Sequence, residues 1–264
     1  MVTVAMPSYG GEEQELVERL EAGRINWSRW VVRTKGVGTP NEKEKSNKTQ
    51  DALVAAQQNA LSKILEVVKH IRLDSTSNVS DYASESDVIL SKIESLIKEA
   101  QVVKQNYLSD GTVEVIMEVS LLGGFSQLIL PQAIKQIGSI KTMAPTQGKY
   151  SPFTGLIVDA RKIDARPAMT LRIVDENREE VYGPAFASRE CAVQHGIGGY
   201  TTDMAFAQNH QRVTNKPLIV KGLRTIGTGS PVIVISNADA SKLRSSSKHL
   251  SFLKKCRVMI VIDQ

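Results

Sequence analysis

The chain has 264 residues, 41% hydrophobic and 23% charged, which is typical of a globular protein with one large domain or two ordinary ones. Aromatic residues make up only 5%, so stacking platforms for single-stranded nucleic acid are scarce. The net charge of +5 arises from basic residues scattered among acidic ones, as in NEKEKSNK at 41–48, and this mixture favours an ordinary solvated surface over a nucleic-acid partner.

Residues 1–23 are predicted to form an N-terminal arm or helix, because GEEQELVERLEAG is an acidic stretch that stops at Gly23. No secretory signal is visible in the opening MVTVAMPSYGGEEQ, which has no charged segment followed by a long apolar one. The longest apolar run, around Val119 to Leu122, is far shorter than the roughly 20 residues that a membrane helix needs. The sequence therefore predicts no transmembrane span.

Residues 24–140 are predicted to form a strand-helix-helix-strand domain. RINWSRWVVRTKGVG has strand character and ends in glycines, and apolar residues recur at helical spacing from about 41 to 72. A second helix is expected from Val88 to the turn at 109–111, with serine and aspartate as candidate caps. TVEVIMEVSL then alternates apolar and polar residues, as in a half-buried strand that two helices can cover.

Residues 151–264 are predicted to form a β-rich domain after a linker at 141–152, whose prolines suggest some relative motion of the two halves. GLIVDAR reads as a strand, and MTLRIVDENREEVYG as two strands around the turn Asp175-Glu176-Asn177, with most of its charges facing water. Two helices around a glycine-rich turn follow, and then three strands with one helix between them. The predicted fold class is α+β, with a mixed, β-rich C-terminal domain.

Charged residues crowd into the segment 151–183, which raises the question of whether they perform chemistry. The repeated DAR places Asp159, Arg161, Asp164 and Arg166 close together. We consider two interpretations, salt-bridged pairs at a strand edge and a polar contact surface.

The two cysteines, Cys191 and Cys256, lie too far apart in the sequence for a CxxC redox motif or a cysteine-rich zinc site. They form either one disulfide or two buried thiols. Cys191 also lies four residues before His195, a spacing that a thiolate–imidazole nucleophile requires if the stretch is helical. No orienting asparagine and no oxyanion loop accompany this couple, and a buried cysteine beside a surface histidine is the commoner arrangement.

No cofactor or metal is expected. The four histidines are dispersed, and no two of them have the i, i+4 spacing, together with a carboxylate, that zinc hydrolases use. KGVGTPN at 35–41 lacks the third glycine of a dinucleotide loop, and GIGGY at 196–200 has no lysine-serine or lysine-threonine after it, so both are interpreted as turns.

Several phrases of the chain resemble a bacterial envelope family, that of the flagellar accessory protein FlgP and related small lipoproteins. In the C-terminal half they are YSPFTGLIVDAR, PAMTLRIVDENREEVYG, SRECAVQHGIGGY, NKPLIVKGLR, VIVISNADASKL and FLKKCRVMIVID. In the N-terminal half they are INWSRWVVRTKGVG, QDALVAAQQNALSKILEVVKHIRLDS and VEVIMEVSL, in the same order. The resemblance covers about Arg24 to Asp263, as a long form with an added C-terminal half.

The resemblance implies a non-enzymatic protein of the periplasm or outer membrane that assembles with itself, as a ring or disk subunit beside the flagellar motor or as a surface filament subunit. Its partners would be further copies and outer-membrane or flagellar-motor proteins, and Asp159, Arg161, Asp164 and Arg166 become candidate subunit contacts. A monomeric periplasmic module that binds cell wall, polysaccharide or an outer-membrane partner is the second hypothesis. A cysteine hydrolase built on Cys191 and His195 is the third.

Overall fold

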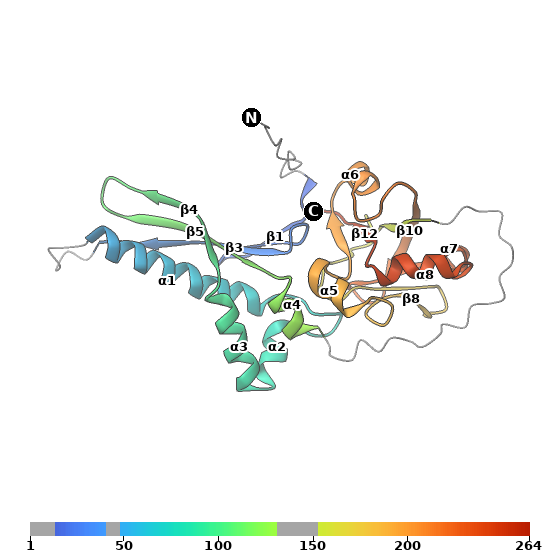
Figure 1. Cartoon of the computed structure of the whole chain (residues 1–264), viewed down its shortest axis with the longest axis horizontal. Coiled ribbons are helices and arrows are strands. Elements are labelled where there is room, and N and C mark those ends of the chain that lie inside the picture. The colour runs from blue at the N-terminus through green and yellow to red at the C-terminus, as the bar shows by residue number, and fades with distance from the viewer. Residues whose placement is uncertain (1–13, 41–47, 131–152) are drawn as a thin grey trace, which may run out of the picture.

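A computed structural model of the chain describes residues 14–40, 48–130 and 153–264. Figure 1 shows an elongated molecule with an N-terminal half of long strands and a long helix, and a C-terminal half of strands surrounded by short helices. Helices and strands of both halves confirm the α+β class. The predicted linker at 141–152 lies outside the described residues.

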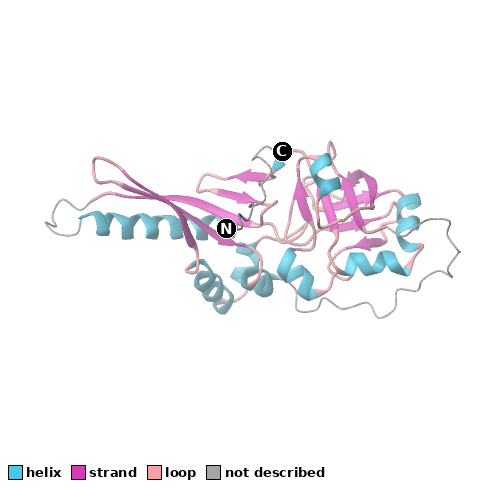
Figure 2. Cartoon of the chain, turned by 45° about the horizontal axis from the view of Figure 1, so that its top comes forward, coloured by secondary structure: helices cyan, strands magenta, loops and turns pink. Residues whose placement is uncertain are grey.

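The N-terminal half is built on a five-stranded antiparallel sheet of order β1-β2-β3-β5-β4. Its strands are β1 (Val17–Arg19), β2 (Arg24–Asn26), β3 (Val31–Gly38), β4 (Gln101–Tyr107) and β5 (Val113–Ser120). Its helices are α1 (Lys48–Lys69), α2 (Val79–Ser84), α3 (Asp87–Ile97) and α4 (Gly124–Ile129). Figure 2 shows α1 lying along the long strands of this sheet.

The close approach of α1 to β3 explains the glycines of KGVGTPN. A Cβ atom on Gly36 would lie 2.0 Å from the carbonyl oxygen of Ala56, and one on Gly38 would lie 2.0 Å from that of Ala52. The buried face of α1 is rich in alanine at these positions, which lets the two backbones meet. These glycines therefore serve helix–strand packing, in agreement with the rejection of a phosphate loop.

Two expectations for the N-terminal half are wrong. Residues 17–19 form strand β1 and pair with β2, where a helix was expected between Pro7 and Gly23. The second helix ends at Ile97, and Gln101–Tyr107 continues as β4 along β5. The reason is tertiary pairing, because each segment gains a partner strand that its local pattern does not announce. The strand predicted over 24–38 is also divided into β2 and β3 by a turn that ends at Trp30, whose φ is +57°.

The C-terminal half is built on a seven-stranded mixed sheet of order β8-β7-β11-β10-β6-β12-β9. Its strands are β6 (Gly155–Asp159), β7 (Arg172–Val174), β8 (Glu180–Tyr182), β9 (Gly199–Thr201), β10 (Pro217–Thr225), β11 (Val232–Ile235) and β12 (Val258–Val261). Its helices are α5 (Arg189–His195), α6 (Met204–Asn209), α7 (Asn237–Arg244) and α8 (Ser247–Lys254).

The strands β10, β6, β12 and β9 run parallel, so their carboxyl ends meet at one edge of the sheet. The strands β7 and β11 are parallel to each other, but β11 is antiparallel to β10 and ends at the opposite edge. The predicted hairpin of β7 and β8 is confirmed. Strand β9 was not expected, and two helices, α7 and α8, stand where one was predicted.

The two halves share one hydrophobic core. Trp27 and Trp30 from the N-terminal half pack on Tyr200 in β9, with ring centroids 6.1 and 5.8 Å from that of Tyr200. Backbone hydrogen bonds also cross the junction, from Met169 N to Arg72 O at 2.9 Å and from Thr170 N to Leu73 O at 2.8 Å. These contacts join the two halves directly, whereas the composition of the linker suggested some relative motion between them.

Candidate functional site

The charged segment Asp159–Pro167 begins at the last residue of β6, at the edge of the sheet where the parallel strands end. Nε and Nη2 of Arg161 donate to Oδ1 and Oδ2 of Asp159 at 2.8 and 2.7 Å. The hydrogen bonds from Arg161 hold the pKa of Asp159 below its usual value, although burial acts in the opposite direction. The first DAR is thus an ion pair within one segment, as the first of the two interpretations expects.

The second DAR is a weaker pair that faces a cleft. Nε of Arg166 lies 3.4 Å from Oδ1 of Asp164, and both side chains are about half exposed. Exposed pairs of this kind contribute little to stability. The other carboxylate oxygen of Asp164 accepts a hydrogen bond of 2.9 Å from the backbone of Gly229, which fixes its orientation.

A cleft with a volume of about 410 Å³ lies between the two halves. Its position, at the carboxyl end of β12 and at a junction between two sheets, is one where ligand sites commonly occur. Figure 1 shows β1 beside the C-terminal end of the chain, and residues of both line this cleft. The lining consists of Leu16–Arg19, Trp27, Asp164–Pro167 and Ile262–Gln264.

The structure brings only two of the four predicted site residues, Asp164 and Arg166, into this cleft; Asp159 and Arg161 lie outside its lining. The sequence did not predict that Leu16–Arg19, around β1, would line the cleft. The only sequence feature of this stretch is the pattern LVERL at 16–20, which was interpreted as helical.

Polar contacts hold the walls of the cleft together. Nε1 of Trp27 donates to Oε2 of Glu18 at 2.9 Å, and the guanidinium of Arg72 lies 3.9 Å from Oε1 of the same carboxylate. Arg72 also donates to the carbonyl of Pro167 at 2.6 Å. Arg72 therefore connects β1 to the loop that carries the second DAR.

Some backbone groups of β1, which lines the cleft, have no hydrogen-bond partner in the described part of the chain. Leu20 and Gly23 exchange two backbone hydrogen bonds, and Trp27 N donates to Leu16 O at 2.9 Å. Hydrogen-bonded residues alternate along an antiparallel strand, so the N–H and C=O groups of Val17 and Arg19 point away from β2. The exposed Arg19 side chain has no hydrogen-bond or ion-pair partner among residues 14–40, 48–130 and 153–264.

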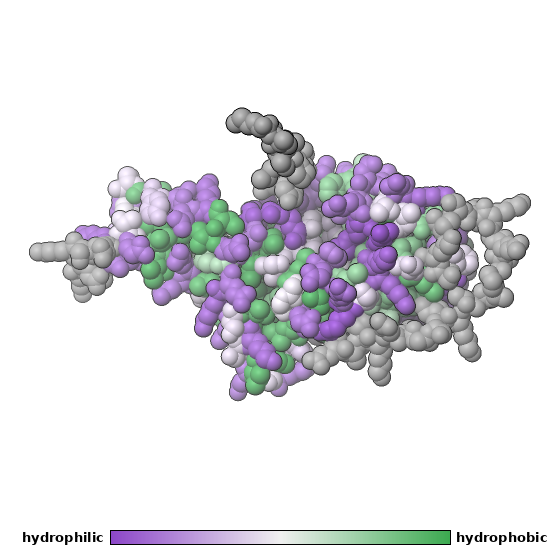
Figure 3. Space-filling model, viewed as in Figure 1, coloured by the Kyte–Doolittle hydropathy of each residue, from purple (hydrophilic) through white to green (hydrophobic). Residues whose placement is uncertain are grey.

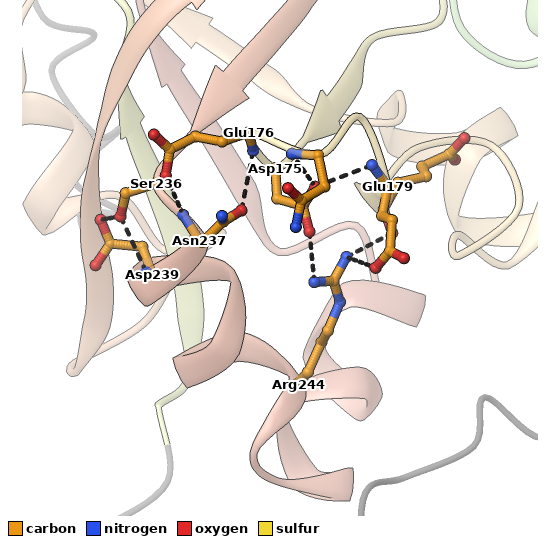
Figure 4. A network of polar contacts seen from close by, with 9 residues as sticks. Asp175, Glu176, Glu179, Ser236, Asn237, Asp239 and Arg244 are labelled. Carbon is orange, nitrogen blue, oxygen red and sulfur yellow. Dashed lines mark hydrogen bonds and ion pairs between the residues drawn. The ribbon is translucent and has the colours of Figure 1, made fainter.

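A second polar cluster lies at the opposite edge of the sheet, where β7 and β11 end (Figure 4). Asp175 is only 2% exposed, and its Oδ1 accepts hydrogen bonds from the backbone of Asn177 and Glu179 at 3.0 and 2.9 Å. Nη1 of Arg244 donates to its Oδ2 at 2.7 Å. Burial raises the pKa of Asp175, but the hydrogen bonds from Arg244 and Glu179 outweigh this and hold the pKa below its usual value.

Reciprocal hydrogen bonds attach the same hairpin to the start of α7. Glu176 N donates to Oδ1 of Asn237 at 3.2 Å, and Asn237 N donates to Oε2 of Glu176 at 2.9 Å. The predicted turn is confirmed, but Asp175 is buried and paired where most of these charges were expected to face water. The cluster thus joins a hairpin to a helix, and its contacts give it a structural role.

Both cysteines are free thiols in the structure, without a disulfide between Cys191 and Cys256, but only Cys256 is buried as the second alternative expected. Burial raises the pKa of Cys256 to about 11, and a thiol must ionise to act as a nucleophile. Cys191 lies half-buried in α5, in the described part of the chain, and forms no hydrogen bond with His195. The geometry of an activated cysteine is therefore not present at this couple.

The described residues contain no group of three or more histidine, cysteine, aspartate or glutamate side chains that could hold a metal ion. They also contain no helix with the length and apolar character that crossing a bilayer requires.

Residues 155–264 match a family model described as the second domain of Treponema pallidum Tp0624. The matched segment begins at the first residue of β6 and includes the whole seven-stranded sheet. It supplies one wall of the cleft, Asp164–Pro167 and Ile262–Gln264, whereas β1 lies outside it. No curated protein matches the chain.

Proposed function

We propose that the chain is a non-enzymatic structural protein of the bacterial envelope, periplasmic or associated with the outer membrane, that assembles with copies of itself. A flagellar-motor ring or disk and a surface filament are the assemblies that the sequence resemblance suggests. The location rests on that resemblance alone. Self-assembly is supported by one observation in the structure, the free outer edge of β4.

Strand β4 is the last strand of its sheet, and exposed apolar side chains lie on it and on Leu108, the residue that follows it. Tyr107 is 56% exposed, Val103 is 48% exposed and Leu108 is 45% exposed. Figure 3 shows hydrophobic residues among hydrophilic ones along the part of the molecule formed by α1 and the β4–β5 hairpin. Free strand edges with such side chains are typical sites of strand pairing between chains.

The hydrogen-bond pattern identifies the free groups of β4. Leu108 N donates to Thr112 O at 2.9 Å, so alternation directs the N–H and C=O groups of Gln105 and Tyr107 away from β5. A bulge between Val102 and Lys104 and the charge of Lys104 oppose pairing along the first part of the strand. The free edge is therefore short, and a second copy would add at Gln105–Tyr107.

Strand β3 extends beyond β2, which pairs only with Val31–Arg33, so its later residues also have an outer edge. This edge is protected, in contrast to that of β4. Nζ of Lys63 donates to Lys35 O at 2.9 Å, and Val37 N donates to Oδ1 of Asn59 at 3.1 Å. Both side chains belong to α1, which thus satisfies the outward backbone groups of β3. This difference favours β4 as the assembly edge.

Native mass and negative-stain imaging of the full chain test the proposal. We expect a large symmetric oligomer for the natural sequence and for Gln105→Ala, and a monomer for Gln105→Pro. The proline removes an outward N–H without removing a hydrogen bond between β4 and β5. A natural chain that stays monomeric at high concentration, or a folded Gln105→Pro variant that still assembles, contradicts the proposal.

The cleft between the two halves favours a second candidate function, that of a monomeric periplasmic module that binds cell wall, polysaccharide or an outer-membrane partner. Monomeric mass together with saturable binding to purified cell wall supports this candidate over self-assembly.

A further inference from the structure

We infer that the cleft beside β1 binds an extended peptide with an acidic side chain, which adds to β1 as a further strand. This site is separate from the β4 edge, and the inference does not depend on self-assembly.

The first argument concerns the backbone. The outward N–H and C=O groups of Val17 and Arg19 offer hydrogen bonds to an added strand, and they lie on the stretch of β1 that lines the cleft. Peptides that add to a sheet edge gain affinity from such main-chain bonds and specificity from the surroundings of alternate side chains. Because β1 has only three residues, the peptide segment that it can pair is equally short.

The second argument concerns shape. A volume of about 410 Å³ is within the usual range of ligand sites, and the cleft has a second wall opposite β1. In that wall Ala165 and Pro167 are buried, and Trp27, which also lines the cleft, is fully buried. The site thus combines apolar and polar lining residues beside a strand edge, which is suited to a short extended peptide with side chains of both kinds.

The third argument concerns charge. The three side-chain carboxylates in the lining already have partners: Glu18 accepts from Trp27, Asp164 from Gly229 and Asp263 from the backbone of Lys162. The Arg19 guanidinium has none among the described residues. An unpaired cation beside a row of free backbone groups favours an acidic side chain in the added strand.

The same argument disfavours β4 of a second copy as the occupant. The outward backbone groups of β4 lie next to Lys104, so pairing of β4 with β1 would bring a second positive charge close to Arg19. An outside peptide with a carboxylate avoids this repulsion.

Fluorescence anisotropy with the full chain tests the inference. The probes are the fluorescein-labelled pentapeptides Thr-Val-Glu-Val-Thr and Thr-Val-Lys-Val-Thr, and a form of the first that is N-methylated at alternate residues. We expect the acidic peptide to bind about tenfold more tightly than the basic one, and Arg19→Glu to reverse this preference. The N-methylated peptide should not bind, because it has lost the N–H donors for β1.

Two variants locate the bound strand. Val17→Pro removes an outward N–H and leaves the β1–β2 hydrogen bonds in place, so it should abolish binding, whereas Val17→Ala should retain it. Thermal unfolding checks the fold of both, and the N-methylated peptide gives the same test if Val17→Pro fails to fold.

Three outcomes overturn the inference. They are no binding of the acidic peptide at millimolar concentration, equal binding of the N-methylated peptide, and unchanged binding to folded Val17→Pro. Loss of oligomers in Val17→Pro without any peptide binding would instead assign this edge to a second copy.

Discussion

Arg244 in α7 donates a hydrogen bond of 2.7 Å from Nη1 to Oδ2 of Asp175, and so connects a helix to the end of a strand 69 residues earlier in the chain. Asp175→Asn removes the charge and leaves Arg244 without its closest partner. We expect the free energy of unfolding to fall by about 1–3 kcal/mol, since buried groups then lose hydrogen bonds. Urea denaturation measures this, with Lys35→Ala in an exposed ion pair as a control that should change stability by less than about 1 kcal/mol.

The same pair makes stability depend on pH. The pKa of Asp175 is lower in the folded chain than in the unfolded one, so its contribution is complete above the unfolded pKa of about 4 and is lost as the pH falls through the folded pKa. The stability difference between the natural chain and Asp175→Asn should therefore shrink below about pH 4. A difference that stays constant down to pH 2 would show that Asp175 does not titrate in this way.

Gly36→Ala should be destabilising although alanine is a small residue. Its Cβ would lie 2.0 Å from Ala56 O and 2.6 Å from Ala60 N, so α1 and β3 must separate. Overpacking of this kind costs about 1–3 kcal/mol, which thermal or urea unfolding would detect. Val37→Ala, at the next and exposed position of β3, is the matched control and should cost clearly less. Equal effects of the two variants would contradict the close packing.

Tyr200→Phe tests whether the two halves unfold as one unit. The hydroxyl accepts a hydrogen bond from Ala168 N at 3.2 Å and donates to Ala168 O at 3.0 Å. Its loss should lower stability by about 1–2 kcal/mol and shift one transition that tryptophan emission and far-UV circular dichroism follow together. Two separate transitions in the natural chain would mean that the aromatic junction does not couple the halves.

Thiol labelling distinguishes the two cysteines. At neutral pH iodoacetamide should modify the half-buried Cys191 and leave Cys256 unmodified, because burial keeps the latter protonated with a pKa of about 11. Both should react after denaturation without reductant. A denatured chain with no reactive thiol would reveal a disulfide, and unusually fast labelling of Cys191 that His195→Ala slows would revive the cysteine hydrolase.

Elements with a complete local pattern could be predicted from the sequence. Alternation in VEVIMEVS identifies β5, helical spacing identifies α1, and the turn formers after Val174 identify the β7–β8 hairpin. In each case side-chain burial follows the period of the element, so the periodicity is visible along the chain.

The cleft could not be predicted, for a physical reason. Its β1 side is a strand of three residues that exists only because β2 pairs with it, and its other sides come from the loop after β6 and from residues 262–264. Local sequence predicts neither short edge strands nor which distant segments meet. Of the site, the sequence therefore predicts Asp164 and Arg166 as polar contact residues but not the walls around them.

The attachment of the first hairpin to the last part of the chain also constrains how the protein matures on the ribosome. Thr201 donates its hydroxyl hydrogen to Gln14 O across 187 residues, and β9, to which Thr201 belongs, has β12 as its partner strand among the described residues. The N-terminal strands emerge long before these partners are synthesised. Trp27 and Trp30 therefore lack their contacts with Tyr200 until the C-terminal half has been synthesised. During this interval a chaperone that shields aromatic side chains would benefit the nascent chain most.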